Sequence, residues 1–146
     1  AHGGGIDRSD CYLVGWTKPE ISRALAAEGY DVVVAPAQAY SLDMANSADW
    51  HEPGAGWAGW SSPENTYALA PGDGWSTSER EHLIGIQGCI WSEPMGDRAV
   101  FDRLVFPRLS AIAETAWTAP HRKNYRRFAA FAGLMPTLYG RREGDV

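Results

Sequence analysis

Residues 32–35, Val-Val-Val-Ala, constrain the fold of this 146-residue chain more than any other segment. They are continuously apolar and mostly β-branched, which is typical of a parallel strand covered on both faces. A second short apolar run, residues 12–15, lies upstream and predicts another buried strand. Residues 17–28 between the two runs carry a helical pattern. Strand, helix and strand in this short span predict a βαβ unit with parallel strands and a right-handed crossover.

The helix between these strands has start and stop signals. Thr17, Lys18, Pro19 and Glu20 form a capping-box pattern with proline in the first turn. Gly29 follows the last periodic residue, where glycine readily adopts the left-handed conformation that ends many helices. We therefore expect the Thr17 side chain to cap a helix that ends just before Gly29.

The second half of the chain predicts one further strand and three helices. The strand begins with the apolar residues 83–86 and is expected to end at Trp91. Asp97 can cap the next helix, Pro107 can open another, and an amphipathic helix is expected from about Lys123. The apolar face of this last helix would consist of Phe128, Phe131 and Leu134. Parallel strands with covering helices fit either an open doubly wound sheet or part of a (β/α)8 barrel.

A long segment between the second and third strands, from Pro36 to about Glu81, has no long periodic pattern. Loops of this length in compact domains are usually functional or disordered, and the aromatic content of this one argues against disorder. It holds four of the chain's seven tryptophans: Trp50, Trp57, Trp60 and Trp75. Because a buried indole N–H needs a hydrogen-bond partner, recognition of a ligand by aromatic rings explains these four better than a core does.

Aromatic and acidic residues follow the predicted strands. Trp16 follows the first, Asp43 follows the second, and Trp91 with Glu93 closes the third. The carboxyl ends of parallel strands share one edge of a sheet, which is where barrel active sites lie. Residues two apart in an extended chain point to the same side, so Trp91 and Glu93 would present a flat apolar ring beside a hydrogen-bond acceptor. That pair suits a sugar. The alternatives are a core tryptophan beside a surface glutamate and, for Asp43, a cap on a helix that starts near Met44.

Composition argues against several classes of function. The formal net charge of -5 gives no support to nucleic-acid binding, and no apolar run approaches the roughly 18 residues of a membrane span. No G-x-G-x-x-G motif joins a strand to a helix. The two cysteines, Cys11 and Cys89, do not imply a disulfide framework, and the four scattered histidines do not supply a metal site. We therefore expect no cofactor, metal ion, nucleic acid or membrane among the partners of this chain.

Five runs of sequence together resemble the catalytic barrel of family 20 glycoside hydrolases, the β-N-acetylhexosaminidases. They are residues 30–36, 42–44, 56–59, 88–93 and 106–114. Each run alone is a weak signal, but five in register are specific. The resemblance implies an α/β fold in which residues 12–138 are the C-terminal portion of a (β/α)8 TIM barrel, about its last three βα units. Residues 1–11 would be a linker or a truncated start, and residues 139–146 a tail.

The resemblance also implies a chemistry. In this family, the 2-acetamido carbonyl of the substrate attacks the anomeric carbon, and an Asp-Glu pair on the fourth barrel strand orients that group and protonates the leaving oxygen. This chain contains no Asp-Glu dipeptide, so we expect it to hold no catalytic residue. It would instead supply one wall of a pocket for the terminal N-acetylglucosamine or N-acetylgalactosamine of a glycan or chitooligosaccharide.

By resemblance, six residues bind the sugar in this wall. They are Trp16, Tyr40, Asp43, Trp57, Trp91 and Glu93. The three indoles would surround the terminal sugar and its acetamido methyl, and the two carboxylates would accept hydrogen bonds from the 4- and 6-hydroxyls. The family usually has tyrosine directly before Leu-Asp, where this chain has Ser41. Tyr40 could make the tyrosine's acetamido contact only if the loop shifted by one residue, because neighbours in an extended segment point apart.

Two alternative functions stay open. The same aromatic wall could form a non-catalytic sugar-binding module. Asp43 and Glu93 could also be the catalytic carboxylates of another glycosidase, if they lay about 5–9.5 Å apart and one had a raised pKa.

The sequence predicts two further structural features. Arg108 and Glu114 are expected to form a buried ion pair that serves the scaffold. Three strands cannot close a barrel, so we expect the chain to be a fragment, a half that pairs with a missing N-terminal part of the barrel, or a homo-oligomer.

Overall fold

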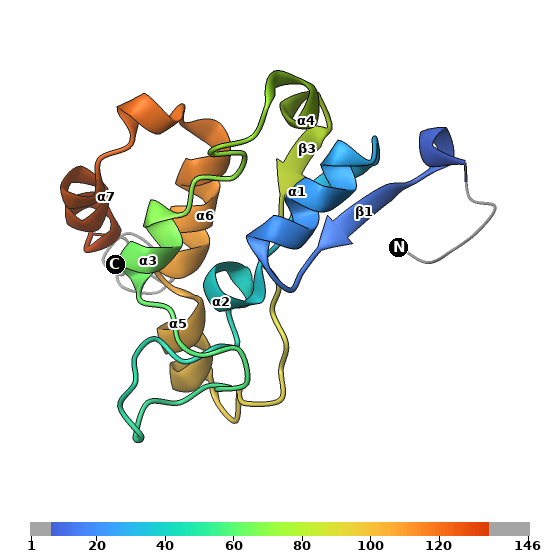
Figure 1. Ribbon diagram of the computed structural model, residues 1–146. Coiled ribbons are helices and arrows are strands. Elements are labelled where there is room, and N and C mark those ends of the chain that lie inside the picture. The colour runs from blue at the N-terminus through green and yellow to red at the C-terminus, as the bar shows by residue number, and fades with distance from the viewer. Residues whose placement is uncertain (1–6, 135–146) are drawn as a thin grey trace, which may run out of the picture.

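The computed structural model describes residues 7–134 and shows a parallel sheet with helices packed beside it (Figure 1). The sheet has three strands in the order β1 (Tyr12–Gly15), β2 (Asp31–Val34) and β3 (Leu83–Ile86). Both neighbouring pairs are parallel, and α1 (Pro19–Ala27) connects β1 to β2. The predicted βαβ unit is confirmed. The tail expected at 139–146 and residues 1–6 of the expected start lie outside the described residues.

Six further helices follow β2 in the described part of the chain. They are α2 (Ala37–Tyr40), α3 (Pro63–Ala68), α4 (Thr77–Glu81), α5 (Arg98–Val105), α6 (Arg108–Trp117) and α7 (Tyr125–Ala132). Short 3-10 turns cover Arg8–Asp10 and Pro120–Arg122. The helices capped by Asp97 and opened by Pro107 are confirmed as α5 and α6. The segment between β2 and β3 is a loop interrupted by three short helices, of which α4 begins with a capping box formed by Ser76 and Glu79.

Helix α1 begins one residue later than predicted. Its N-cap is Lys18, no side chain caps it, and Pro19 is its first residue. The capping-box prediction for Thr17 was wrong because proline fixes its own φ and disfavours the helical conformation in the residue before it. The predicted end is confirmed, since Gly29 has a φ of +84° directly after the C-cap residue Glu28.

The third strand is shorter than predicted. It ends at Ile86 rather than at Trp91, because after Val34 the neighbouring chain turns away into α2. One isolated bridge, between Ser41 and Cys89, resumes the parallel pairing further along. Trp91 therefore lies on an extended segment beyond the sheet.

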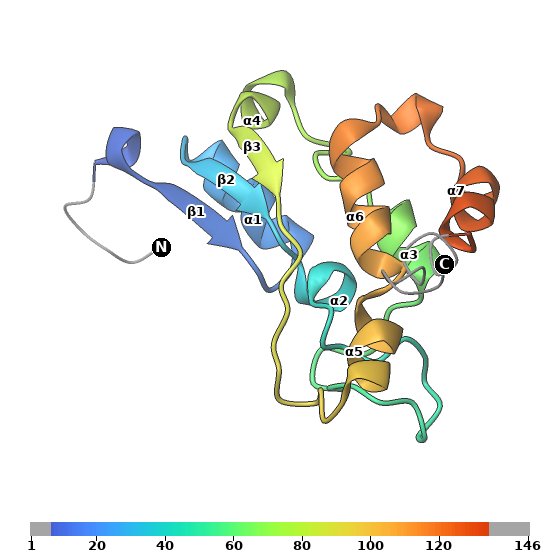
Figure 2. The same ribbon diagram turned by 180° about the vertical axis from the view of Figure 1, so that it is seen from behind.

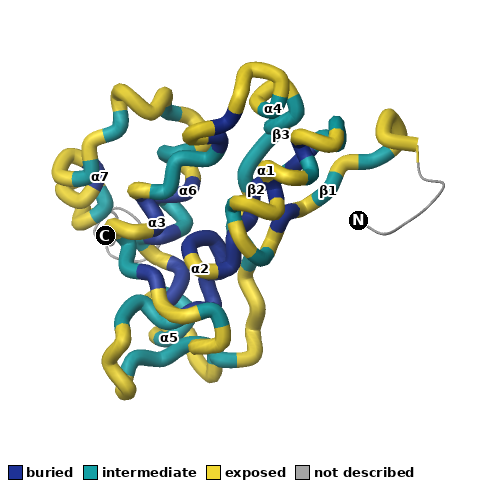
Figure 3. The backbone as a smooth tube through the Cα atoms, viewed as in Figure 1, coloured by how far each residue is buried: buried dark blue, intermediate teal, exposed yellow. Residues whose placement is uncertain are grey.

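Two of three clusters of buried apolar side chains hold the sheet and its neighbouring helices together, and the third joins α3, α6 and α7. One lies between α1 and the sheet and contains Ala26, Val32, Val34 and Trp75. The other joins α2 to α5 and α6 and contains Ala39, Tyr40, Leu42, Val105 and Ile112. In Figure 3, the buried residues of these clusters lie along β2, α2 and the inner side of α6. Trp75 is 9% exposed, so its assignment to a recognition surface was wrong. The other three loop tryptophans are exposed.

Two predictions of burial were also wrong. Strand β1 was expected to be buried, but Tyr12 is 60% exposed and Val14 is 36% exposed. Figure 2 shows the strands in front of α1, which covers the opposite face of the sheet. On α7, Phe128 packs on Tyr67 and is buried, whereas Phe131 is exposed, and Leu134 lies beyond the end of the helix and is also exposed. The described residues thus leave one face of the sheet and part of α7 without a covering layer.

The segment that follows α2 is paired on both sides. Ser41 bridges to Cys89, and Met44 bridges to Ala55. The second bridge is closed by a hydrogen bond from the Ala55 N–H to the Asp43 carbonyl, at 2.8 Å. These bridges draw the loop that contains residue 55 and the extended segment after β3 toward Asp43.

Gly54 permits the close approach between the loop that contains residue 55 and the Asp43 backbone. Its φ is +119°, and a Cβ there would lie 2.7 Å from the Ala45 nitrogen and 2.9 Å from the Asp43 oxygen. We expect Gly54→Ala to lower the free energy of unfolding by about 2–4 kcal/mol, since backbone strain and a steric clash add. Urea denaturation measures the change.

Gly59→Ala is the matched control, because Gly59 also has a positive φ, +96°, but no atom lies near its Cβ position. Gly59→Ala should lower the free energy of unfolding only through the backbone strain of a positive φ, by about 1–2 kcal/mol. Equal losses in the two variants would contradict the close approach at Gly54.

Candidate functional site

A pocket of about 640 Å³ lies at the carboxyl ends of the strands. Its walls come from the segment after β1, the turn after α2, the loop before α3 and the extended segment after β3. They are formed by Trp16, Ser41, Asp43, Ala55, Trp57, Cys89, Trp91, Glu93 and Pro94. The structure therefore brings together five of the six candidate residues. Trp91 and Glu93 both line the pocket, although Glu93 lies in a turn and not in an extended segment.

Three indole rings line this pocket. Trp16, Trp57 and Trp91 are 56%, 62% and 58% exposed. The rings of Trp16 and Trp57 touch edge to face, with centroids 6.2 Å apart at 66°. Rings in contact, each with a large free surface, can cover an apolar face of a ligand at little cost in side-chain order. The pocket thus presents exposed aromatic surface along its walls.

Asp43 is the most buried charged group of the pocket, at 3% exposed. Its Oδ1 atom has no hydrogen-bond partner among the described residues. Burial raises the pKa of Asp43, and the charge of Glu93 raises it further, while its own backbone N–H and the charge of Arg108 lower it. No helix begins near Met44, so the capping interpretation of Asp43 was wrong. A buried carboxylate oxygen without a partner is suited to accept a hydrogen bond from a ligand.

Tyr40 does not line the pocket. It ends α2 and is fully buried in the core beside Val105 and Ile112. Burial raises the pKa of Tyr40, an effect that the Thr115 hydroxyl partly offsets. The adjacent residue, Ser41, which follows the end of α2, lines the pocket instead.

The expected ion pair between Arg108 and Glu114 does not form. Glu114 accepts a hydrogen bond from the Tyr67 hydroxyl at 2.9 Å and lies 3.8 Å from Arg127. Arg108 is fully buried and donates to backbone carbonyls. Residues six apart on a helix lie about 120° from each other around its axis, so the two side chains leave α6 in different directions.

Cys89, Ala55 and Pro94 line the pocket although they were not predicted to do so. A signal existed for Cys89, because it lies two residues before Trp91 on an extended segment. No local signal existed for Ala55, which reaches the pocket through its bridge to Met44.

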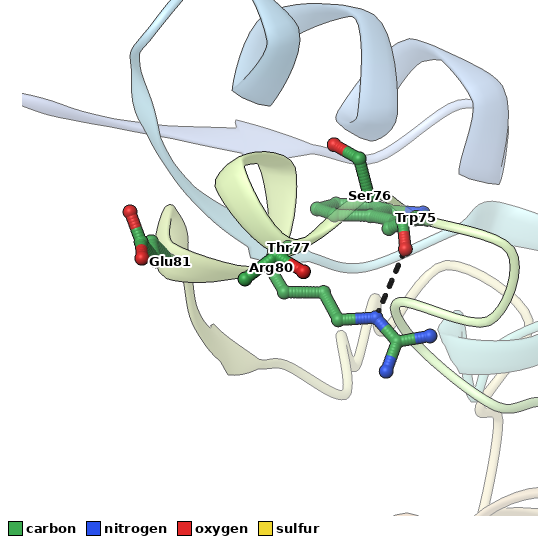
Figure 4. A pocket seen from close by; sticks show the side chains of 5 residues that line it. All are labelled: Trp75, Ser76, Thr77, Arg80 and Glu81. Atoms are coloured by element: carbon green, nitrogen blue, oxygen red, sulfur yellow. Dashed lines mark hydrogen bonds between the residues drawn. The ribbon is translucent and has the colours of Figure 1, made fainter.

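A second depression, of about 610 Å³, lies beside α4 at the other end of β3 (Figure 4). The polar groups there are largely used within the protein. Arg80 donates to the Trp75 carbonyl at 3.1 Å, and Ser76 belongs to the capping box of α4. Glu81 points away from the other side chains in Figure 4, and the Trp75 ring is buried in the core. The pocket at the carboxyl ends is therefore the better candidate.

Two further findings concern residues 7–134. No helix in this range is long and apolar enough to cross a membrane. No three His, Cys, Asp or Glu side chains in the same range gather closely enough to hold a metal ion. Cys11 and Cys89 are both free thiols.

Comparison with known proteins places this chain in a family of glycosidases. The family model described as the catalytic domain of glycosyl hydrolase family 20 matches residues 2–120, so the chain belongs to this family. It is 30% identical to a beta-hexosaminidase of Vibrio furnissii, over 77% of this chain and 18% of that protein. It is 32% identical to a beta-N-acetylhexosaminidase of Cellulomonas fimi, over 73% of this chain and 21% of that protein.

A solved structure shows the same relationship in three dimensions. It is the GH20 exo beta-N-acetylglucosaminidase from Vibrio harveyi in complex with N-acetylglucosamine, with a TM-score of 0.82 and 31% identity. The match covers 94% of this chain and 22% of that one. The catalytic domains of such neighbours are TIM barrels. This chain spans about a fifth of the length of the relatives it matches.

The charge coupling in the pocket gives a prediction. We expect carbon-13 NMR titration to find the pKa of Asp43 above the usual value for aspartate, and Glu93→Gln to lower it, because the glutamate charge opposes ionisation of Asp43. Glu64→Gln removes an exposed carboxylate on α3 and should leave the pKa of Asp43 unchanged. An ordinary pKa for Asp43, or a pKa that is the same in Glu93→Gln as in the wild type, would contradict this description of the pocket.

Proposed function

We propose that this chain is part of a β-N-acetylhexosaminidase that removes terminal non-reducing N-acetylglucosamine or N-acetylgalactosamine by substrate-assisted retaining hydrolysis. Its role is to supply a wall of the sugar pocket, and the Asp-Glu catalytic pair lies elsewhere. The observation that carries the proposal is the pocket itself, in which three indoles face a buried Asp43 with an oxygen that lacks a partner.

The chemistry of the wall matches that of a sugar. Indole faces pack on the apolar C–H faces of a pyranose and exclude water, which strengthens polar contacts nearby. Asp43 and Glu93 accept hydrogen bonds from ring hydroxyls, and such bonds to a charged acceptor contribute roughly 1.5–3 kcal/mol each. Support also comes from the Vibrio harveyi relative, whose structure is described as a complex with N-acetylglucosamine.

The acetamido side of the sugar is where this chain departs from the family pattern. Ser41 lies in the pocket where the family has a tyrosine, and Tyr40 is buried in the core. A serine hydroxyl is shorter, so we infer that its contact with the acetamido oxygen is weaker or bridged by water. This difference concerns substrate-assisted attack, which depends on how the acetamido group is oriented.

We further propose that β1, β2 and β3 are about the last three strands of a TIM barrel. The exposed Tyr12, Val14 and Ile84 side chains on the sheet are apolar, as expected of positions that other barrel strands would cover. The missing partner is then the N-terminal part of the barrel, or a second copy of the chain.

Sugar binding without turnover is the expected behaviour of the chain alone. An NMR titration should show N-acetylglucosamine bound in the millimolar range, because one wall holds the ligand and the other is absent. Asp43→Asn should weaken binding about tenfold, as loss of one charge-assisted hydrogen bond implies. Asp73→Asn, at an exposed aspartate outside the pocket, is the control. Binding should fall as the pH drops through the raised pKa of Asp43, because the protonated carboxyl is a poorer acceptor.

A chromogenic N-acetylglucosaminide separates the alternatives. No hydrolysis is expected from the chain alone. Turnover that disappears in Glu93→Ala would instead indicate that Asp43 and Glu93 are themselves the catalytic pair. Tight, saturable sugar binding without turnover would favour a non-catalytic sugar-binding module.

The exposed sheet gives a second prediction. We expect sedimentation velocity to show self-association of the isolated chain, because apolar side chains and the edges of β1 and β3 have no partner within residues 7–134. Val14→Lys should reduce it, whereas Phe131→Lys, at an exposed phenylalanine on α7, should not. A compact monomer with cooperative melting would count against a missing barrel partner.

A further inference from the structure

Arg108 is the largest fully buried side chain in the described part of the molecule. Its Nε and Nη2 atoms donate to the Leu104 carbonyl at 3.0 and 2.7 Å. The same Nη2 donates to the carbonyls of Leu42 at 2.9 Å and Met44 at 2.8 Å. Leu42 and Met44 are the two neighbours of Asp43. The guanidinium thus holds the backbone on both sides of the buried pocket carboxylate.

We propose that Arg108 is a positioning residue of the sugar pocket, which fixes the backbone around Asp43 and so directs the Asp43 carboxylate toward the bound sugar. The proposal rests on the proposed function insofar as the ligand is a sugar. Its structural part, that Arg108 controls the geometry at Asp43, stands independently of the ligand.

The first argument is energetic. A buried cation loses its hydration at a cost of several kcal/mol, and burial lowers the pKa of Arg108 to about 10. A packed apolar side chain would stabilise a scaffold equally well or better. Because two of the four hydrogen bonds of Arg108 reach the carbonyls on either side of Asp43, positioning of that segment explains a buried guanidinium here better than packing does.

The second argument concerns charge. Among nearby charges, that of Asp43 contributes most to offsetting the burial of Arg108, and the charge of Arg108 in turn favours ionised Asp43. Arg108 Nη1 and Asp43 Oδ1 are both buried, and neither has a hydrogen-bond partner among the described residues. Arg108 therefore favours the charged form of Asp43 as well as its position, and leaves one carboxylate oxygen available to a ligand.

The third argument is that the held segment organises the rest of the pocket. The bridge from Ser41 to Cys89 leads to Trp91 and Glu93 two and four residues further on. The bridge from Met44 to Ala55 leads in the same way to Trp57. A loss of the Arg108 contacts would hence disturb more than one wall of the pocket.

Arg108→Lys tests the proposal, because lysine keeps the charge but lacks the forked donor geometry. Lys123→Met is the matched control. Lys123 is a cation that is only partly buried, and its ammonium group donates to the carbonyls of Tyr67 and Leu69 and to the Thr115 hydroxyl, none of which lines the pocket.

The first readout is hydrogen exchange by NMR, which needs no sugar. The amides of Leu42, Ala45 and Ala55 are hydrogen-bonded around Asp43. In Arg108→Lys they should exchange about tenfold faster or more relative to the β2 amides. Lys123→Met should leave that ratio unchanged even if it lowers overall stability. The same ratio in both variants would overturn the proposal.

The second readout is N-acetylglucosamine affinity, measured at a temperature where each variant is folded. Arg108→Lys should lose about tenfold in affinity, as expected when a charged hydrogen-bond acceptor is displaced, and Lys123→Met should lose none. Wild-type protein that binds no sugar would refute the proposed function, while hydrogen exchange would still decide the role of Arg108.

A third measurement uses only the wild-type chain, in case Arg108→Lys does not fold. Native-state exchange over a denaturant series should show the Arg108 Nε proton and the three amides opening together, with one free energy and one denaturant slope. Opening of the guanidinium independently of these amides would overturn the proposal.

Discussion

The pairing of the segment after α2 is the constraint on which the pocket depends. This segment is too short to form a strand, yet it bridges to Cys89 on one side and to Ala55 on the other. Strands β2 and β3 are parallel, so the segments that follow them run in the same direction. The two bridges then bring residues that are distant in sequence close to Asp43. These backbone hydrogen bonds thus form a frame that positions the indoles and carboxylates of the pocket.

Burial and charge act together at the centre of this frame. Asp43 is buried beside a second carboxylate, which raises its pKa, and a buried arginine opposes that effect. Burying a carboxyl group costs free energy unless it has a hydrogen-bonding or charged partner. Such groups are therefore common at functional sites, where a ligand can provide the partner. A sugar hydroxyl supplies that partner in the proposed function. The open indole faces beside it indicate a ligand with apolar faces, consistent with the family to which the chain belongs.

Strong local patterns made much of this structure predictable from sequence. The valines of β2, Gly29 after α1 and Pro107 before α6 each act within a few residues, and the strand, helix end and helix start that they predict are present, although β2 is fully covered on one face only. Predictions failed where tertiary packing decided the outcome. Trp75 entered the core because α1 lies over it, and Arg108 turned away from Glu114 toward the Asp43 segment. The positions of Ala55 and Tyr40 depend on long-range bridges and on burial, for which one sequence carries no periodic signal.

A crystal structure of this chain with N-acetylglucosamine would test the central claim most directly. The account predicts a sugar in the pocket at the carboxyl ends of the strands, with an indole against a C–H face and a ring hydroxyl donating to the Asp43 carboxylate. A sugar bound at another surface, with Asp43 still lacking a partner, would contradict it.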